Sequence, residues 1–300
     1  MSSGISLALT LLFLTLIKSV PIVYAALGGV ISERSGVVNI GLEGMMTAGA
    51  FSAVVFTNMT GSPIIGLLAG IFFGAFLGFI LGFAATFFKV DQIVAGVGIN
   101  LVALGGAAYG LVLIFNQPGA SPQVNQLGSG GVPFLPQVTT GEAAFIVLAV
   151  LCAFGLNWFI YRTPWGLRIQ ACGENPRAVT DAGLDPLRLR LYSVIVSGAL
   201  AGLGGAFLSI CEVNLYSDGM TAGRGFIALA AVIFGRWTPW GATGAAVFFG
   251  FFEALQYVLQ GRISWLPSDA MQALPYLAAL FAIAGLVGRV RAPAADGVPY

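Results

Sequence analysis

The chain has 300 residues, of which 58% are hydrophobic and 8% are charged, with a mean hydropathy of +0.92 and a net charge of +1. An ordinary soluble domain has about a quarter of its residues charged, so this composition excludes a soluble globular protein, and the balanced charge gives no reason to expect a nucleic-acid partner. It predicts an all-α fold, a polytopic bundle of transmembrane helices that forms a single domain over residues 1–300.

Crossing the hydrocarbon of a membrane takes a helix of about twenty apolar residues. The first candidate lacks the basic start of a cleavable signal peptide, so we expect it to stay as a membrane helix. A ninth run, residues 225–235, is too short to cross comfortably and is either a half-helix, a re-entrant piece or part of a tilted span that begins near Met220. The eight long runs are residues 5–27, 37–56, 63–88, 93–115, 143–161, 191–211, 240–259 and 271–287.

The basic residues indicate the orientation of these spans. If residues 225–235 cross, there are nine passes, with the N-terminus outside and the C-terminus in the cytoplasm, and ten of the 13 basic residues face the cytoplasm. Arg224 and Arg262 then lie outside, and Lys18 is left within the first span. If the run turned back, Arg289 and Arg291 would move outside and the asymmetry would weaken, so we favour the crossing.

Small residues recur at helical spacing in two of the expected spans. A stripe of glycines lets a second backbone approach closely, so the pattern predicts tightly crossing helices. In the third span the glycines are Gly66, Gly70, Gly74, Gly78 and Gly82, and in the sixth the small residues are Ser197, Gly198, Ala201, Gly202, Gly205 and Ala206.

Residues 162–190 form the longest charged interval and carry five arginines, which places them in the cytoplasm. Asn175 is a good N-cap, Pro176 suits the first helical position and Gly183 suits the residue after the helix. The sequence therefore predicts a two-turn helix at residues 176–182, with Ala178, Val179 and Ala182 on one side and Arg177 beside Asp181. It is either a docking element for another protein or an ordinary solvated loop with an interfacial helix.

Ionisable and amide side chains inside membrane spans are costly and are candidates for function. They either line a passage for a polar solute or make interhelical hydrogen bonds that fix the packing. Asn39 and Glu43 are expected on one helical face, because they are four residues apart. Glu212 and Asp218 are expected to be solvated at the outer end of the sixth span. The pathway candidates are Asn39, Glu43, Gln92, Asn100 and Glu253.

Missing residues and motifs narrow the chemistry further. The sequence has no histidine, and Cys152, Cys172 and Cys211 are far apart, so no catalytic residue, metal site or disulfide framework is indicated. GxxxxGK[ST], HExxH and GxSxG are all absent, which argues against ATP hydrolysis by this chain and against the common hydrolases. The sequence therefore indicates a protein that is not an enzyme.

Three stretches together carry a resemblance to a known family: SERSGVVNIGLEGMM at 32–46, ACGENPRAVTDAGLD at 171–185 followed by SGALAGLGGA, and MTAGRGFIALAAVIFGRWTPWGA at 220–242. They resemble the membrane permease subunits of ABC importers in the ribose and branched-chain amino-acid permease superfamily. NIGLEG at 39–44 and DQIVAGVGIN at 91–100 resemble the nucleoside branch, whereas the GIDLS-type motif of the sugar branch is absent.

This resemblance implies a subunit of a bacterial inner-membrane importer that works by alternating access and forms half of the pathway. It needs no cofactor itself, since cytoplasmic ATPase subunits bind ATP and Mg²⁺. A second permease subunit, a paralogue or a second copy, and an extracytoplasmic solute-binding protein complete the assembly within the membrane lipid. The implied ATPase-docking residues are Glu174, Asn175, Pro176, Arg177, Ala178, Asp181, Ala182 and Gly183, and the gate candidates are Arg224, Gly225, Phe226 and Gly235.

The solute and the energy source leave alternatives open. A nucleoside is favoured, and a simple sugar, riboflavin or a purine base is open. A different class would be an ion-coupled secondary transporter that uses Glu43 or Glu253 as a carboxylate relay. A third class is an integral-membrane transferase, but the sequence shows no paired-carboxylate or cationic active-site cluster that would support it.

Overall fold

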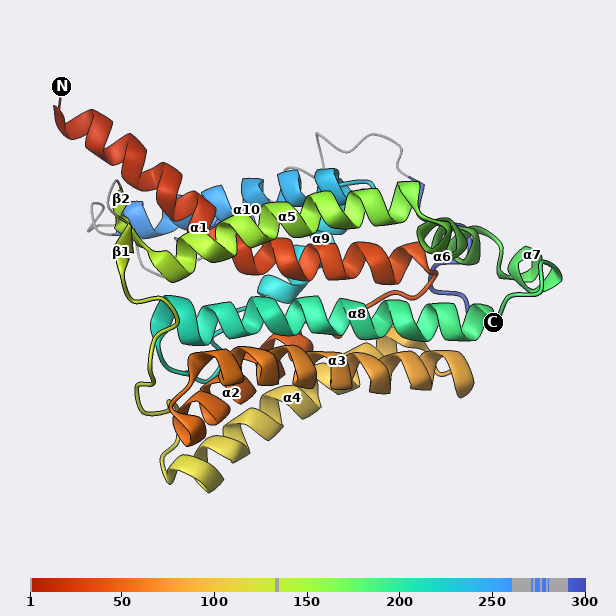
Figure 1. The fold of residues 1–300 in the computed structure, drawn as a ribbon, viewed down its shortest axis with the longest axis horizontal. Coiled ribbons are helices and arrows are strands. Elements are labelled where there is room, and N and C mark those ends of the chain that lie inside the picture. The colour runs from red at the N-terminus through yellow and green to blue at the C-terminus, as the bar shows by residue number, and fades with distance from the viewer. Residues whose placement is uncertain are drawn as a thin grey trace.

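The computed structural model describes residues 2–132, 135–260, 271, 273–275, 277–278, 280 and 291–300, and the described chain is overwhelmingly helical, which confirms the all-α prediction (Figure 1). A small antiparallel hairpin, β1 (Gly131–Val132) and β2 (Leu135–Thr139), is the exception. The helices are α1 (Ser2–Arg34), α2 (Leu42–Thr60), α3 (Pro63–Phe87), α4 (Gln92–Phe115), α5 (Thr140–Arg162), α6 (Pro164–Glu174), α7 (Pro176–Asp181), α8 (Pro186–Ala206), its π-helical continuation η1 (Phe207–Val213), α9 (Arg224–Phe234) and α10 (Pro239–Gln260).

Six described helices are long and apolar enough to cross a membrane: α1, α3, α4, α5, α8 with η1, and α10. They coincide with six of the predicted spans. The helix at residues 225–235 is also present, as the short α9. The last predicted span, residues 271–287, lies largely outside the described residues, as do Arg262 and Arg289.

The second predicted span was wrong at its start. Residues 37–41, expected to be helical, belong to a non-helical segment between Arg34 and Leu42, and α1 instead continues to Arg34. Gly36 has a φ of +91°, a left-handed conformation that glycine tolerates best, and this turns the chain out of α1. Asn39 therefore does not share a helical face with Glu43.

The centre of the bundle is formed by α1 and α8. In their most apolar 18-residue stretches, 72% and 78% of the residues are buried. The other spans lie around them and expose more of their apolar surface. Figure 1 shows α6, α7 and the C-terminus at one end of the bundle and the N-terminus with the β1–β2 hairpin at the opposite end. The charged interval 162–190 is therefore located at the same end as residues 291–300.

The predicted glycine contacts are confirmed between α3 and α8. A methyl carbon built on Gly74 would lie 2.3 Å from the carbonyl oxygen of Gly198, and one on Gly202 would lie 2.3 Å from the carbonyl oxygen of Gly70. Real methyl carbons do not approach backbone so closely, and backbone cannot move aside as a flexible side chain can. The two helices therefore touch through their main chains, and α2 packs against both of them.

Gly202→Ala is expected to destabilise the bundle by about 1–3 kcal/mol, because the added methyl overlaps the backbone of α3. The measurement is the thermal unfolding midpoint of the purified protein in detergent. The matched control is Gly105→Ala on α4, where a methyl carbon meets no atom within 4 Å. Equal midpoints for the two variants would contradict the close approach of α3 and α8.

Candidate functional site

The first turns of α2 and α9 meet through one carboxylate. Glu43 Oε1 accepts a hydrogen bond from the backbone nitrogen of Gly223 at 2.8 Å, and its Oε2 accepts one from that of Gly225 at 2.7 Å. These nitrogens belong to the start of α9, where backbone N–H groups have no partner within the helix. Glu43 thus caps α9 from another helix and places a negative charge at the positive end of its dipole.

The non-helical segment before α2 is held by amide side chains of α4. Asn100 accepts from the backbone nitrogen of Gly44 at 2.7 Å and donates to the carbonyl oxygen of Ile40 at 3.0 Å. Gln92 accepts from the backbone nitrogen of Val38 at 2.8 Å. The side chains therefore replace the helical hydrogen bonds that this segment lacks.

Asn39 is directed toward α8 rather than toward α9. Its Nδ2 donates to the hydroxyl of Ser197 at 2.8 Å, while its Oδ1 is buried without a partner in the described structure. Asn39 thus joins the segment before α2 to α8, Gln92 holds the backbone of that segment, and neither lines either of the two cavities described below. Glu43, Asn100 and Glu253 do line them.

Arg224 at the start of α9 is paired with Glu253 of α10. Both residues are buried; Nε lies 3.3 Å from Oε2, and Nη2 bonds Oε1. Nη1 of the same guanidinium donates to the carbonyl oxygen of Met220 at 2.8 Å. The pair joins α9 to α10, just as Glu43 joins α9 to α2.

A second buried ion pair was missed from the sequence. Lys18 of α1 bonds Glu212 of η1, and the lysine nitrogen lies 4.0 Å from the ring centroid of Tyr257. Glu212, expected to be solvated, has a side chain only 12% exposed. The signal was available, because Lys18 had no partner in its own span and burial of an unpaired charge is costly.

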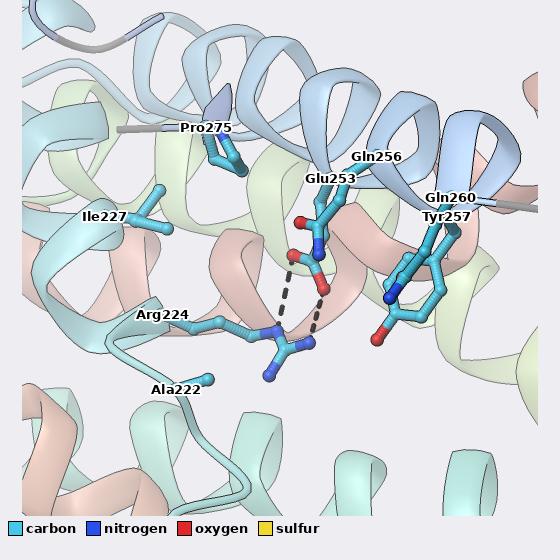
Figure 2. A pocket seen from close by; sticks show the side chains of 8 residues that line it. All are labelled: Ala222, Arg224, Ile227, Glu253, Gln256, Tyr257, Gln260 and Pro275. Atoms are coloured by element: carbon cyan, nitrogen blue, oxygen red, sulfur yellow. Dashed lines mark hydrogen bonds and ion pairs between the residues drawn. The ribbon is translucent and has the colours of Figure 1, made fainter. Parts of the chain in front are cut away.

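Two cavities flank the first turn of α9 and share Ala222. The polar cavity has a volume of about 320 Å³ and is shown in Figure 2. The apolar cavity has a volume of about 420 Å³. Lining residues of the polar cavity include Arg224, Glu253, Gln256, Tyr257, Gln260 and Pro275, and those of the apolar cavity include Glu43, Thr47, Asn100, Leu101, Leu104 and Phe226.

The gate candidates separate into two groups. Arg224, Gly225 and Phe226 lie together at the start of α9 between the cavities. Gly235 follows the other end of this helix, where a methyl carbon would lie 2.1 Å from the backbone nitrogen of Ala242. Both ends of α9 are closely packed, since a methyl carbon on Gly225 would lie 2.4 Å from the backbone nitrogen of Glu43, and the two cavities lie beside its start.

The charged interval contains the predicted helix as α7. The side chain of Asn175 accepts from the backbone nitrogens of Arg177 and Ala178 at 3.2 and 3.3 Å, and Gly183 has a φ of +78°. Both expected cap positions are confirmed. Within the described chain, no ion pair joins Arg177 to Asp181.

The expected common side of α7 is wrong in part. Val179 is 3% exposed and packs with Cys172 and Leu189, whereas Ala178 and Ala182 are exposed. Burial raises the pKa of the Cys172 thiol, so this cysteine is a packing residue. Val179 therefore anchors α7, and the two alanines present its free surface.

Arg190 of α8 connects this interval to the segment before α2. Its side chain is 2% exposed and donates to three carbonyl oxygens, those of Ser35 at 3.2 Å, Val298 at 2.8 Å and Ala295 at 3.2 Å. Burial raises the pKa of the nearby Asp296 to about 7, although the charge of Arg190 opposes this shift. One buried guanidinium thus ties together α8, the 35–41 segment and residues 291–300.

Comparison with known proteins gives one consistent family. Residues 11–287 match the family model for the branched-chain amino acid transport system / permease component. The chain is 39% identical to the guanosine ABC transporter permease protein NupQ of Bacillus subtilis (strain 168) and 37% identical to the nucleoside ABC transporter permease protein NupC of Lactococcus lactis subsp. cremoris (strain MG1363), each time over 95% of this chain and 94% of the relative.

More distant similarities agree with this. The guanosine ABC transporter permease protein NupP of the same Bacillus strain is 26% identical over 94% of this chain and 85% of its own length. The fold is similar to that of a metal-chelate type ABC transporter in an inward-facing conformation, with a TM-score of 0.54 at 16% identity, covering 90% of this chain and 83% of that one. At this identity the structural likeness shows the fold alone.

Glu43→Ala is expected to destabilise the protein by about 1–3 kcal/mol, because it leaves the partly buried N–H groups of Gly223 and Gly225 without their acceptor. Glu43→Gln keeps one acceptor oxygen and should have a smaller effect. The measurement is the thermal midpoint in detergent, with Asp181→Ala at an exposed position of α7 as the control. A midpoint for Glu43→Ala equal to that of the control would show that the cap contributes nothing to stability.

Proposed function

The chain belongs to the family of permease components of branched-chain amino acid transport systems, and we propose that it forms half of the translocation pathway of an ATP-driven nucleoside importer. The main support for this proposal is sequence similarity. Over 95% of its length, the chain is 39% identical to a guanosine ABC transporter permease protein and 37% identical to a nucleoside ABC transporter permease protein. Relatives similar along nearly their whole length share the membrane fold and the pathway that it forms.

The pathway lies on the face that carries the two cavities. Phe226 beside the apolar cavity is 48% exposed, and Tyr257 beside the polar cavity is 46% exposed. A second permease subunit facing this surface would close both cavities into one conduit around the start of α9. Because α9 covers only about half of the hydrocarbon thickness, its first turn is suited to open and close that conduit.

In this proposal, α7 couples ATP hydrolysis on the partner subunits to transport. This helix is capped at Asn175 and anchored by Val179, and it presents Ala178 and Ala182 to a partner. ATP and Mg²⁺ are bound by cytoplasmic ATPase subunits that dock there. Arg190 carries a displacement of this end to Ser35, and the 35–41 segment leads directly to Glu43 and α9.

The remaining partners follow from the same family. Two different guanosine permease proteins, NupQ and NupP, are known in one Bacillus strain, and this supports a paralogue as the second permease subunit. A solute-binding protein would deliver the nucleoside on the outer side of a bacterial inner membrane. The N-terminus is then outside, and residues 162–190 and the C-terminus are cytoplasmic.

A secondary transporter is the less favoured function. Its relay would need a carboxylate that exchanges protons with the pathway. Glu43 is engaged by two backbone N–H groups and Glu253 by a guanidinium, so both carboxylates already have structural partners.

The function is tested by ATP-dependent uptake. Proteoliposomes that contain the permease pair and the ATPase subunits, supplied with the binding protein, should accumulate labelled guanosine only with ATP inside. Glucose, riboflavin and guanine serve as the competing solutes. Accumulation by this chain alone under a proton gradient, without ATP, would overturn the importer function.

Ala178→Arg or Ala182→Arg is expected to lower ATP-driven uptake about tenfold or more, while the ATPase subunits keep their own hydrolysis, because a bulky charge is placed on the docking surface of α7. The readouts are the uptake rate and the ratio of ATP hydrolysed to solute moved. Asn58→Arg, which adds the same side chain at an exposed position near the C-terminal end of α2, is the control. Full coupling in both alanine variants would move the docking surface elsewhere.

A further inference from the structure

The polar cavity has the dimensions and lining of a small-molecule site. Its volume of about 320 Å³ lies within the usual range for ligand pockets, about 300–1,000 Å³. Figure 2 shows Glu253, Gln256, Tyr257 and Gln260 of α10 along one side and Ala222, Arg224 and Ile227 of the α9 start along the other. The wall thus combines an aromatic ring, two amides and a paired charge.

The charges of this cavity are neutralised by protein partners. The guanidinium of Arg224 is occupied by both oxygens of Glu253 and by the carbonyl oxygens of Met220 and Thr221. Its positive charge is therefore not available to a phosphate group. A neutral solute enters such a cavity more favourably than a phosphorylated one, whose charge would be desolvated without a counter-ion.

Tyr257 offers an aromatic surface to this space. The nitrogen of Lys18 lies 4.0 Å from the ring centroid and covers one face of the ring, yet the residue is still 46% exposed and lines the cavity. Aromatic side chains bind bases by stacking, because every base has a flat π-face. A base stacked here would lie across the ring from Lys18.

Gln256 and Gln260 supply the hydrogen-bonding groups. Gln260 is exposed and Gln256 is partly exposed, both line the cavity, and in the described part of the chain neither amide has a hydrogen-bond partner. Each amide carries a donor and an acceptor, which complements the mixed edge of a purine or pyrimidine. They stand next to Tyr257 on α10, at the edge of any ring stacked on it.

We propose that the polar cavity is a binding subsite for the base of an uncharged nucleoside, which stacks on Tyr257 and hydrogen-bonds Gln256 and Gln260. The proposal rests on the proposed function, since it takes the solute to be a nucleoside. Solute released on the outer side would occupy this subsite first and then pass the start of α9 at Ala222 into the apolar cavity. The subsite gives this chain a selectivity of its own, in addition to that of a binding protein.

The test measures binding and uptake by the assembled transporter. The permease pair with its ATPase subunits, in nanodiscs without binding protein, is equilibrated with labelled guanosine and separately with guanosine 5′-monophosphate. Guanosine should bind at least tenfold more tightly than the monophosphate. Equal binding of the two would overturn the assignment to an uncharged solute.

Tyr257→Leu should weaken guanosine binding about tenfold and slow its ATP-driven uptake, whereas Tyr257→Phe keeps the ring and should stay close to the parent protein. Tyr109→Leu, which removes a 69% exposed tyrosine from α4 outside the cavity, is the matched control. If Tyr257→Leu does not assemble by size-exclusion chromatography, Gln260→Leu decides. It should weaken guanosine binding about threefold or more and change the preference between guanosine and uridine.

The two possible failures differ in their signature. If the parent transporter imports guanosine but Tyr257→Leu and Gln260→Leu behave like Tyr109→Leu, the subsite is refuted and the nucleoside importer remains. If the parent transporter imports no nucleoside but carries another solute of the panel, the proposed function fails and the subsite fails with it.

Discussion

The carboxylate of Glu43 joins the starts of two helices, α2 and α9, beside the apolar cavity. In the hydrocarbon of a membrane no water satisfies a free backbone group, so a helix can begin there only if its first N–H groups find partners in the protein. The start of α9 finds them in Glu43, which stands in the first turn of α2. The 35–41 segment before α2 depends in turn on Gln92 and Asn100 of α4. The start of α9 is therefore held by a side chain of α2, and the 35–41 segment is held by side chains of α4.

This dependence gives the bundle a route from one end to its middle. The described contacts run from α7 through Val179 and the α8 side chain of Arg190 to Ser35, and from there along the chain to Glu43 and the first turn of α9. The glycine-packed pair α3 and α8 provides a rigid support beside it, because main chains in contact cannot be compressed. In the proposed importer, a displacement at α7 would reach the start of α9 along these contacts.

The sequence predicted the parts of this arrangement that follow from local chemistry. The N-cap Asn175, the glycine stripe of α3 and the boundaries of α4 follow from spacing and capping preferences, which depend on near neighbours along the chain. The break at residues 35–41 was missed because Val37, Val38 and Ile40 are equally apolar in a helix and in an extended segment. The partners of Glu43 and Lys18 were missed because they lie on helices distant in sequence, and no local pattern encodes which helices are adjacent.

The buried ion pairs show why polar residues are placed where they are. A buried pair contributes little net stability over apolar side chains of the same volume, since desolvation of both charges offsets most of their attraction. Stability alone therefore does not account for Arg224 and Glu253 at the wall of a cavity. Their effect is to make that wall polar without a net charge, while the same guanidinium holds the carbonyl of Met220 and so fixes the approach to α9. The proposed subsite thereby has a hydrophilic wall that suits an uncharged, hydrogen-bonding solute.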